Sequence, residues 1–544
     1  MQKIILLFVS TLFVVSCQPP KTAVDLLVIN ANVYTVDDSN PKAEAFVIAD
    51  GKFVKIGSTK DILKSYSALD TLDAKGKTIV PGLIDAHCHF YGLGLQQQKV
   101  DLTGTKSYDE VLQRIAAFQK EKNLSFITGR GWDQNDWEVK EFPTKEKLDS
   151  LFPNTPVAVR RVDGHAMLVN QKALDMAKIT VNTTVEGGEI VKKDGKLTGV
   201  LIDNPMRLVE AVIPDPRVHE QVQALKDAEK INFSYGLTTV DDAGLSPQVI
   251  ALVDSLQKKD ELKIRMYAMV SNVPAYIEQY LKSGVHKTDR LNVSSFKVYA
   301  DGALGSRGAV LKKPYSDQEN HYGAMVIGTD EFKELAKRLA GSPFQMNTHA
   351  IGDSANAVVM NTYYEVLKNK SDRRWRVEHA QVVAPEEFEI LNDNLVMSVQ
   401  PTHATSDMYW ADERLGEERI KGAYAYKDLL EKTGKIALGT DYPVEHVSPF
   451  YTFYAAVARK DLKQYPKAGF QKENALTREE TLKGMTLWAA YSNFEETEKG
   501  SITNGKFADF VVLQENIMEI EEDKIPNIQV NATYVNGEKV FGKD

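Results

Sequence analysis

The chain has 544 residues and a formal net charge of −9 at pH 7, and its residues are 43% hydrophobic and 26% charged. This composition is typical of a globular protein with ample material for a large core, and the length predicts two or three domains or one large barrel with insertions. Because the negative charge is spread along the chain, it indicates solubility and argues against a nucleic acid as partner.

The N-terminal residues predict an export signal rather than a part of the fold. The apolar run over residues 4–15 is too short to span a bilayer and is typical of the hydrophobic region of a signal peptide. Val14-Val15-Ser16-Cys17 resembles a bacterial lipobox, in which Cys17 is lipidated and begins the mature protein. We expect a signal peptide over 1–16, a spacer over 17–23, and a lipid anchor to a bacterial membrane on its periplasmic or cell-surface face. The alternative is an ordinary signal peptide cut elsewhere.

Short β-rich runs occupy both ends of the folded chain. The predicted strands are 25–36, 45–56, 71–79, 510–513 and 532–540. Asp50-Gly51 and Asn536-Gly537 have the residues of hairpin turns. Two β-rich ends around a mixed middle predict one small β-sandwich built from both termini, over residues 24–78 and 499–544.

The middle of the chain, over residues 79–498, alternates predicted strands with helical stretches. The strand candidates are 78–89, 236–242, 264–270, 295–301, 344–349, 375–379, 395–400 and 435–441. Eight βα units predict an α/β chain with a TIM (β/α)8 barrel, unless the count reflects the choice of boundaries. The first connection is too long for a βα loop, so we expect an inserted subdomain over about 95–230, where insertions commonly build substrate pockets.

Residues of the metal-binding type end four of the predicted strands. Alternation along the first strand places His87 and His89 on one face, where two imidazoles can chelate a metal. His349, His379 and Asp441 end three later strands in the same way. For a single histidine a structural role is the better prediction, but the set at matching positions on four strands favours a metal site.

The segments around these residues resemble the amidohydrolase superfamily, in particular its family-3 branch, which includes N-substituted formamide deformylases. The resemblance extends over about residues 25–539 and includes the sandwich fed by both termini. Its most specific motifs are PGLIDAHCHF, VDGHAMLVNQKAL, KVYADGALGSRGA, NTHAIGD, RVEHAQ and LGTDYPV.

The resemblance implies a role for Lys297, in the fourth predicted barrel strand. In the family pattern this lysine bridges two metals after carboxylation. A free ammonium between two dications would be strongly repelled, whereas CO₂ converts the amine into an anionic oxygen ligand. The alternative is an uncarboxylated lysine that contacts substrate beside a single metal. The implied cofactor is therefore one or two divalent ions, with Zn²⁺ preferred.

The same resemblance implies a metal-assisted hydrolysis, in which the metal lowers the pKa of a water towards ~7. Asp441 is expected to accept the water proton and deliver it to the leaving nitrogen. His165, from the insertion, is predicted to help bind substrate or the oxyanion. Trp132, Asp301 and Arg307 are further substrate-binding candidates. Arg307 lies in a glycine-rich turn, where capping a loop carbonyl is an equal alternative.

Three functions remain open at this point. The first is hydrolysis of a C–N bond in a non-peptide amide, a formamide or a cyclic imide. The second is hydrolysis of a C–O or P–O bond in a lactone or phosphoester at the same site. The third is a non-catalytic binding lipoprotein, which has no need for Asp441. The preference for the first rests on the resemblance alone. The expected partners are a small-molecule substrate and the membrane through the lipid anchor only, and a homodimer is compatible with the sequence.

Overall fold

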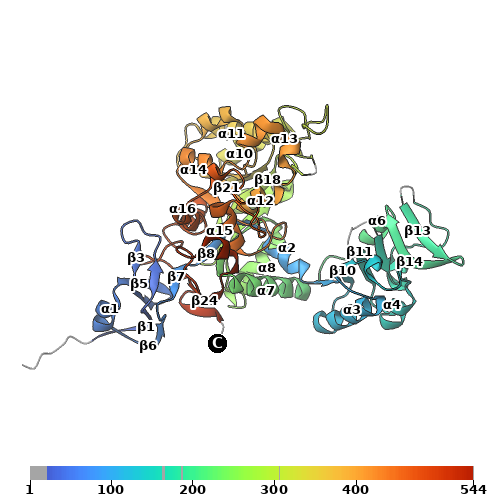
Figure 1. The fold of residues 1–544 in the computed structure, drawn as a ribbon, viewed down its shortest axis with the longest axis horizontal. Helices are drawn as coiled ribbons and strands as arrows, with labels where there is room; N and C mark the ends of the chain where they lie inside the picture. The colour runs from blue at the N-terminus through green and yellow to red at the C-terminus, as the bar shows by residue number, and fades with distance from the viewer. Residues whose placement is uncertain (1–20, 162–165, 186–187, 306, 543–544) are drawn as a thin grey trace, which may run out of the picture.

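The computed structural model describes residues 21–161, 166–185, 188–305 and 307–542. Three bodies are visible in Figure 1: the sheets formed by the chain ends, a central barrel with its helices, and a lobe to its right. The predicted signal peptide, Cys17 and His165 lie outside the described residues. None of the helices in the described part combines the length and the apolar character needed to cross a bilayer.

Strands from both ends of the chain pair with one another. A four-stranded sheet has the order β5-β4-β1-β6, and a six-stranded sheet has the order β25-β24-β23-β7-β2-β3. Phe46 of the first sheet packs against Phe510 of the second, with ring centroids 5.0 Å apart, so the two chain ends share one apolar core. The strands are β1 (Thr22–Ile29), β2 (Asn32–Tyr34), β3 (Lys42–Ala43), β4 (Ala45–Ala49), β5 (Lys52–Gly57), β6 (Tyr66–Asp73), β7 (Thr78–Pro81), β23 (Phe510–Leu513), β24 (Val530–Val535) and β25 (Glu538–Gly542).

Eight parallel strands form a nearly closed barrel in the order β22-β21-β20-β19-β18-β16-β15-β8, and β17 (His286–Lys287) pairs beside β18. The open seam lies between β22 and β8. Two backbone hydrogen bonds join the segment after β22 to the carboxyl end of β8. They run from Asp441 N–H to the His87 carbonyl at 2.7 Å and from His89 N–H to the Tyr442 carbonyl at 2.8 Å. The strands are β8 (Leu83–Cys88), β15 (Leu237–Leu245), β16 (Arg265–Ser271), β18 (Leu291–Tyr299), β19 (Gln345–Ala350), β20 (Trp375–His379), β21 (Leu395–Val399) and β22 (Ile436–Leu438).

Helices cover the outside of the barrel, and α8 shows how the sequence builds them. Its N-cap is Ser246, whose side chain accepts a hydrogen bond from Val249 N–H, and Pro247 occupies the first turn. Val249, Val253 and Leu256 then bury one face of the helix in the main core. The helices outside the lobe are α1 (Thr59–Ser65), α2 (Phe90–Gln96), α7 (Val218–Ser234), α8 (Pro247–Lys258), α9 (Pro274–Ser283), α10 (Thr329–Ala340), α11 (Asp353–Leu367), α12 (Pro401–Asp407), α13 (Ala411–Arg419), α14 (Tyr426–Thr433), α15 (Pro449–Ala458), α16 (Arg478–Gly484) and α17 (Leu487–Ser492).

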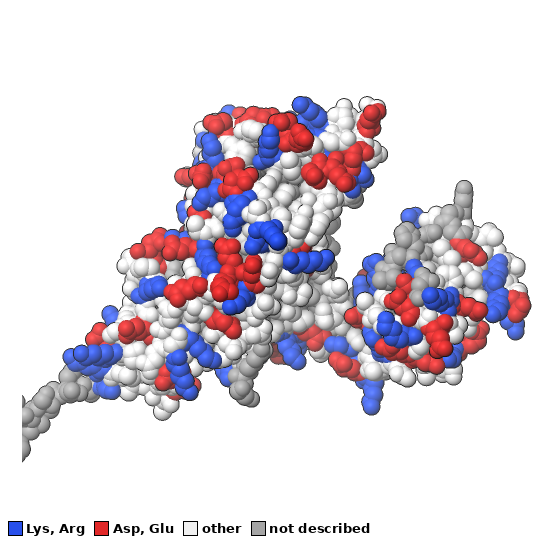
Figure 2. Space-filling view, viewed as in Figure 1, with Lys and Arg blue, Asp and Glu red and all other residues white. Residues whose placement is uncertain are grey.

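The chain between α2 and α7 forms the lobe, whose six-stranded sheet has the order β13-β14-β12-β11-β10-β9. It has apolar clusters of its own, and Figure 2 shows a gap between it and the upper part of the barrel on this face. At its base, Lys122 forms an ion pair with Asp227 of α7 at 2.6 Å. Its elements are β9 (Lys99–Asp101), α3 (Tyr108–Lys122), β10 (Ile127–Trp132), α4 (Glu146–Leu151), β11 (Val157–Arg161), β12 (Ala166–Val169), α5 (Gln171–Met176), β13 (Gly188–Lys193), β14 (Lys196–Asp203) and α6 (Met206–Glu210).

The eight strands expected for the barrel all overlap barrel strands, which confirms the barrel. The first needs correction, because the run 78–89 is two strands in two sheets. Thr78–Pro81 pairs with β23, and Leu83–Cys88 pairs with β15. Gly82 lies between them, and a Cβ at this position would stand 2.2 Å from Thr238 Oγ1. Only glycine allows the backbone to pass this close between the two sheets.

Candidate metal centre

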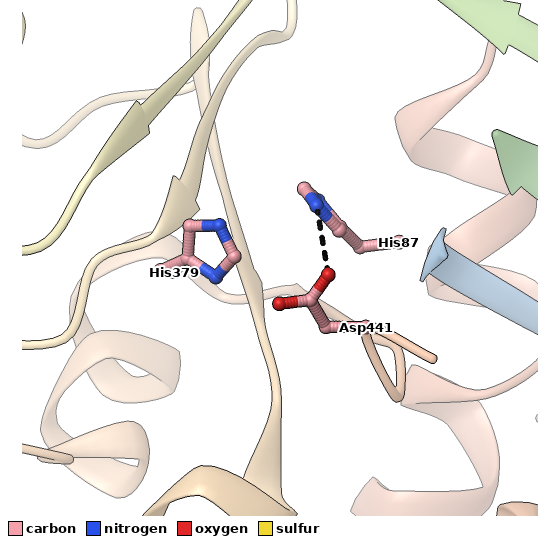
Figure 3. Close-up of side chains that lie close together, drawn as sticks. All are labelled: His87, His379 and Asp441. Atoms are coloured by element: carbon pink, nitrogen blue, oxygen red, sulfur yellow. Dashed lines mark ion pairs between the residues drawn. The ribbon is translucent and has the colours of Figure 1, made fainter. Parts of the chain in front are cut away.

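Three buried side chains converge at the carboxyl ends of the barrel strands. His87, His379 and Asp441 each offer one ligand atom within 4.8 Å of the other two, and all three are buried. Figure 3 shows them facing a common space. The backbone φ is +73° at His379 and +62° at Asp441, a left-handed conformation that costs about 1–3 kcal/mol for residues other than glycine. The fold therefore holds two of the three in strained positions that aim their side chains inward.

The other predicted ligands belong to the same cluster. His89 Nε2 lies 3.2 Å from Asp441 Oδ1, and Lys297 Nζ lies 3.1 Å from His87 Nε2. The ring of His349 lies 4.5 Å from that of His379, measured between centroids. The structure thus brings together all six side chains that the sequence suggested as ligands.

Asp85 explains why the segment after β22 returns to β8. Its carboxylate accepts hydrogen bonds from Thr440 N–H at 3.0 Å, from the Thr440 hydroxyl at 2.7 Å and from His87 N–H at 3.2 Å. Burial raises the pKa of Asp85 to about 7, although the bonds from Thr440 act to lower it. This buried carboxyl fixes Asp441, the next residue after Thr440, against the strand that carries His87.

A buried charge network supports His87 from behind. Its Nδ1 donates to Glu378 Oε2 at 2.5 Å, and Glu378 Oε1 forms an ion pair with Arg376 at 2.7 Å. Burial acts to raise the pKa of Glu378, but Arg376 and His87 hold it well below its usual range. Burial and Lys297 lower the pKa of His87 to about 4, so the contact with Glu378 is a hydrogen bond from a neutral imidazole. Nε2 of His87 is therefore the unprotonated nitrogen, whose lone pair can bind a metal ion.

Two further imidazoles of the cluster, those of His379 and His349, are also held neutral. Burial, followed by the neighbouring His349 and His87, lowers the pKa of His379 well below its usual value. Its Nδ1 donates to Gln400 Oε1 at 2.7 Å, which leaves Nε2 free. Burial and Lys297 lower the pKa of His349 to about 3. Neutral imidazoles with one nitrogen fixed by a hydrogen bond are the form in which histidine binds metals.

His403 is a member of the site that the sequence reasoning missed. Its Nε2 lies 3.3 Å from Asp441 Oδ2 and its Nδ1 lies 3.1 Å from Glu445 Oε1. Burial acts to lower the pKa of His403, but its bonds to these two carboxylates raise it to about 10. A search for metal-type residues at strand ends could not find it, because it lies in α12, beyond the end of β21. The available signal was a histidine in the segment directly after the seventh strand.

Asp301 organises a loop beside the cluster. Its carboxylate accepts backbone N–H groups from Val310 at 2.9 Å, Ile351 at 3.0 Å and Gly352 at 2.8 Å. Burial raises the pKa of Asp301 to about 6, against the opposing effect of these hydrogen bonds. Its Oδ1 lies 3.7 Å from His349 Nε2. Its oxygens are thus engaged in holding the segment after β18 next to a predicted ligand.

The described contacts of Trp132 and Arg307 are made within the lobe and within a loop, and none of the contacts named below joins either residue to the cluster. The Trp132 ring is fully buried in the core of the lobe, and its Nε1 donates to the Val159 carbonyl at 2.9 Å. This placement does not support a substrate contact for Trp132. The Arg307 guanidinium forms an ion pair with Asp317 at 2.7 Å. The backbone carbonyl of Arg307 lies 2.9 Å from His321 Nε2. Arg307 thus ties its own loop together.

The donor set fits a divalent metal. Imidazole nitrogens and a carboxylate oxygen are ligands that Zn²⁺ prefers, and here they converge from β8, β19 and β20 and from the segment after β22. Asp441 Oδ1 is buried and, among the described atoms, lacks a hydrogen bond, although His89 Nε2 is close by. A buried acceptor without a donor is costly, and a bound cation would satisfy it.

Comparisons with known proteins agree with this geometry. A family model described as "Amidohydrolase family" matches residues 70–541. The chain is 33% identical over 548 residues to protein LONG AFTER FAR-RED 3 of Arabidopsis thaliana, with 97% of this chain and 93% of that protein covered. It is 25% identical over 539 residues to an N-substituted formamide deformylase of Arthrobacter pascens, with 94% and 97% covered. An uncharacterized metal-dependent hydrolase from Pyrococcus furiosus has a similar structure, with a TM-score of 0.77, 26% identity, and 91% of this chain and 100% of that chain covered.

Proposed function

Because this chain belongs to the amidohydrolase family, we propose that it hydrolyses a C–N bond other than a peptide bond, in an amide, a formamide or a cyclic imide. The observation that carries the proposal is the convergence of His87, His379 and Asp441 within 4.8 Å at the barrel mouth. The choice of C–N is supported by the similarity to a formamide deformylase. A carboxylate that no helix or strand needs for its own hydrogen bonds, placed close to the neutral imidazoles of His87 and His379, suits proton transfer at a metal site.

The proposed metal is Zn²⁺, bound by His87, His89, His349, His379 and Asp441. When bound, it would polarise the carbonyl of the substrate and lower the pKa of a water towards ~7. The protein holds His87 and His379 in the neutral state and fixes their orientation, through Glu378 next to His87 and Gln400 next to His379.

Asp441 is the proposed proton shuttle. Its carboxylate accepts the proton that the attacking water loses and delivers it to the leaving nitrogen, so an amine departs rather than an amide anion. The pKa of Asp441 is well below its usual range, because the hydrogen bond with His403 and the close contact with His89 outweigh the effect of burial. The carboxylate therefore starts the reaction ionised and able to accept a proton.

Lys297 is proposed to be a carboxylated lysine that bridges two metals. Its side chain is buried in the cluster, where burial lowers the pKa of the amine to about 8. The neutral amine adds to CO₂ with loss of one proton, which gives an N-carboxylate that carries one negative charge. The negative charge of the N-carboxylate would replace the positive charge of the lysine ammonium, which nearby metal ions would repel.

The proposal places the protein outside the cytoplasm, held to a membrane by lipid on Cys17. This part is supported by the sequence only: an apolar run over residues 4–15 that ends at Val14-Val15-Ser16-Cys17. Acyl chains on a single cysteine would anchor the barrel, which would then act on small molecules at the membrane surface.

A hydrolysis panel tests the function. The zinc-loaded protein is assayed with N-acyl amines, N-acyl amino acids, N-substituted formamides, cyclic imides, lactones and phosphoesters, and the His379→Ala variant serves as the control. We expect turnover of one of the C–N classes, lost in the variant. Turnover of lactones or phosphoesters alone would replace C–N by C–O or P–O hydrolysis. Absence of turnover in every class would leave the proposed enzymatic function unsupported.

A further inference from the structure

His403 makes contacts to two carboxylates at once. It projects from α12 (Pro401–Asp407), immediately after β21, and 12% of its side chain is exposed. Nε2 lies 3.3 Å from Asp441 Oδ2, and Nδ1 lies 3.1 Å from Glu445 Oε1. Both ring nitrogens are therefore engaged, which leaves the imidazole only one orientation in the site.

The two oxygens of Asp441 have different surroundings. Oδ1 lies 3.2 Å from His89 Nε2 and 3.7 Å from His87 Nε2, so it faces two of the predicted metal ligands. Oδ2 lies 3.3 Å from His403 Nε2 instead. The terminal torsion of an aspartate is broad, so nothing within the residue itself selects which oxygen faces the ligands. A hydrogen bond to Oδ2 from outside the cluster would make that selection.

Glu445 fixes His403 in turn. Besides the contact with His403, its Oε1 accepts the Ser406 hydroxyl at 2.6 Å. His403 and Ser406 both belong to α12, whereas Glu445 lies on the segment after β22 that also carries Asp441. The carboxylate of Glu445 therefore joins the helix after the seventh strand to the segment after the eighth. This joint holds the donor at a constant place relative to Asp441.

We propose that His403 is a positioning residue for Asp441, holding Oδ2 so that Oδ1 stays directed at His87 and His89. The inference rests on the proposed function for the role that it gives Asp441. A shift of about 1 Å in a group that acts on a reacting atom can cost on the order of 10²-fold in rate. Supporting hydrogen bonds of this kind typically contribute about 10–100-fold in metal affinity or activity.

Two substitutions separate the two contacts of the ring. In His403→Gln, the amide nitrogen reaches the place of Nε2 and can still donate to Asp441. In His403→Asn, the shorter amide reaches only the place of Nδ1 and can still donate to Glu445. We expect kcat to fall about 10–100-fold in His403→Asn and to remain within several-fold of the wild type in His403→Gln. Zinc content and KM should change little in both.

His446→Gln is the matched control. This histidine lies on the same segment as Glu445, but its ring packs against Tyr235 and Tyr451 instead of the carboxylates. We expect its kcat to equal that of the wild type. Should His403→Asn not fold, His403→Met removes the donor at similar volume, and the same loss is expected for it.

Crystal structures of the zinc-loaded variants give a readout that does not depend on any substrate. We expect the Asp441 carboxylate to keep its orientation in His403→Gln and to rotate or become disordered in His403→Asn. If the wild type cleaves nothing in the panel, the proposed function fails while these structures still decide the positioning role. An unchanged Asp441 in His403→Asn, or full kcat in that variant and loss in His403→Gln, would overturn the inference.

Discussion

Glu378 Oε2 lies 2.5 Å from Nδ1 of His87, and neither side chain is exposed to solvent. The contact fixes which nitrogen of His87 carries the proton and keeps the other nitrogen free. We expect Glu378→Gln to weaken zinc binding about 10–100-fold, because the carboxylate that orients the imidazole loses its charge. Competition with a chelator of known affinity measures the change. Glu387→Gln is the control, since Glu387 is similarly buried but pairs with Lys312. Equal zinc affinity in Glu378→Gln and the wild type would contradict this role.

Metal content tests the centre as a whole. The purified protein should contain about one to two equivalents of divalent metal, because neutral imidazoles and one carboxylate surround a single space. Elemental analysis gives the number, and dialysis against a chelator should abolish hydrolysis of whichever substrate the panel identifies. Restoring Zn²⁺ should restore the rate. Full activity in a sample shown to be free of metal would refute the proposed chemistry.

Asp441→Asn separates proton transfer from metal binding. The variant keeps the size of the side chain but cannot accept a proton, and a general base typically contributes about 10²–10⁴-fold. We expect kcat to fall by at least that range, with little change in thermal stability and most of the metal retained by the histidines. Measuring metal content and kcat on one preparation distinguishes the roles. Loss of the metal would make Asp441 mainly a ligand, and near-normal kcat would exclude it as the shuttle.

The ion pair between Arg265 and Asp509 lies outside the site, and we expect the stability of the protein to depend on it. Arg265 of β16 is fully buried, and its Nε and Nη2 contact the two oxygens of Asp509 at 2.6 and 2.9 Å. Removing one partner of a buried ion pair costs about 3–5 kcal/mol, so Asp509→Ala should lower the midpoint of thermal unfolding clearly. In Asp260→Ala the exposed pair with Arg290 is lost, at a cost of about 0–1 kcal/mol. Equal shifts of the unfolding midpoint in the two variants would show that the buried pair contributes no more to stability than the exposed pair.

The lipid anchor is tested by Cys17→Ala. If Cys17 carries the acyl chains, the variant should leave the membrane fraction or accumulate with its leader uncut. Fractionation of cells that express wild type and variant, followed by mass determination of the N-terminus, provides the measurement. Cys88→Ala is the control, because Cys88 is buried in the barrel. A variant that remains bound to membranes with a cleaved leader would rule out the lipobox.

The barrel and the clustering of the candidate ligands could be predicted because one rule connects them. In a parallel barrel the strand ends meet at one face, so metal-type residues at successive strand ends must approach one another. That rule found His379 and Asp441, but it cannot find His403, which reaches the site from a helix. It also gives no information on Trp132, because a tryptophan in a glycine-rich stretch suits a pocket and a core equally. Only the packing of the lobe decides between them.

Pairing between β7 and β23 affects the order in which the molecule can assemble. β7 is translated before the barrel and β23 after it, and β7 cannot complete its sheet until β23 has left the ribosome. Until then β7 exposes an unpaired edge. Because β7 leads through Gly82 directly into β8, the strand that carries His87 continues from a strand whose partner is synthesised after the barrel. We therefore expect a nascent chain that stops before Phe510 to lack the support that sets the first strand of the barrel.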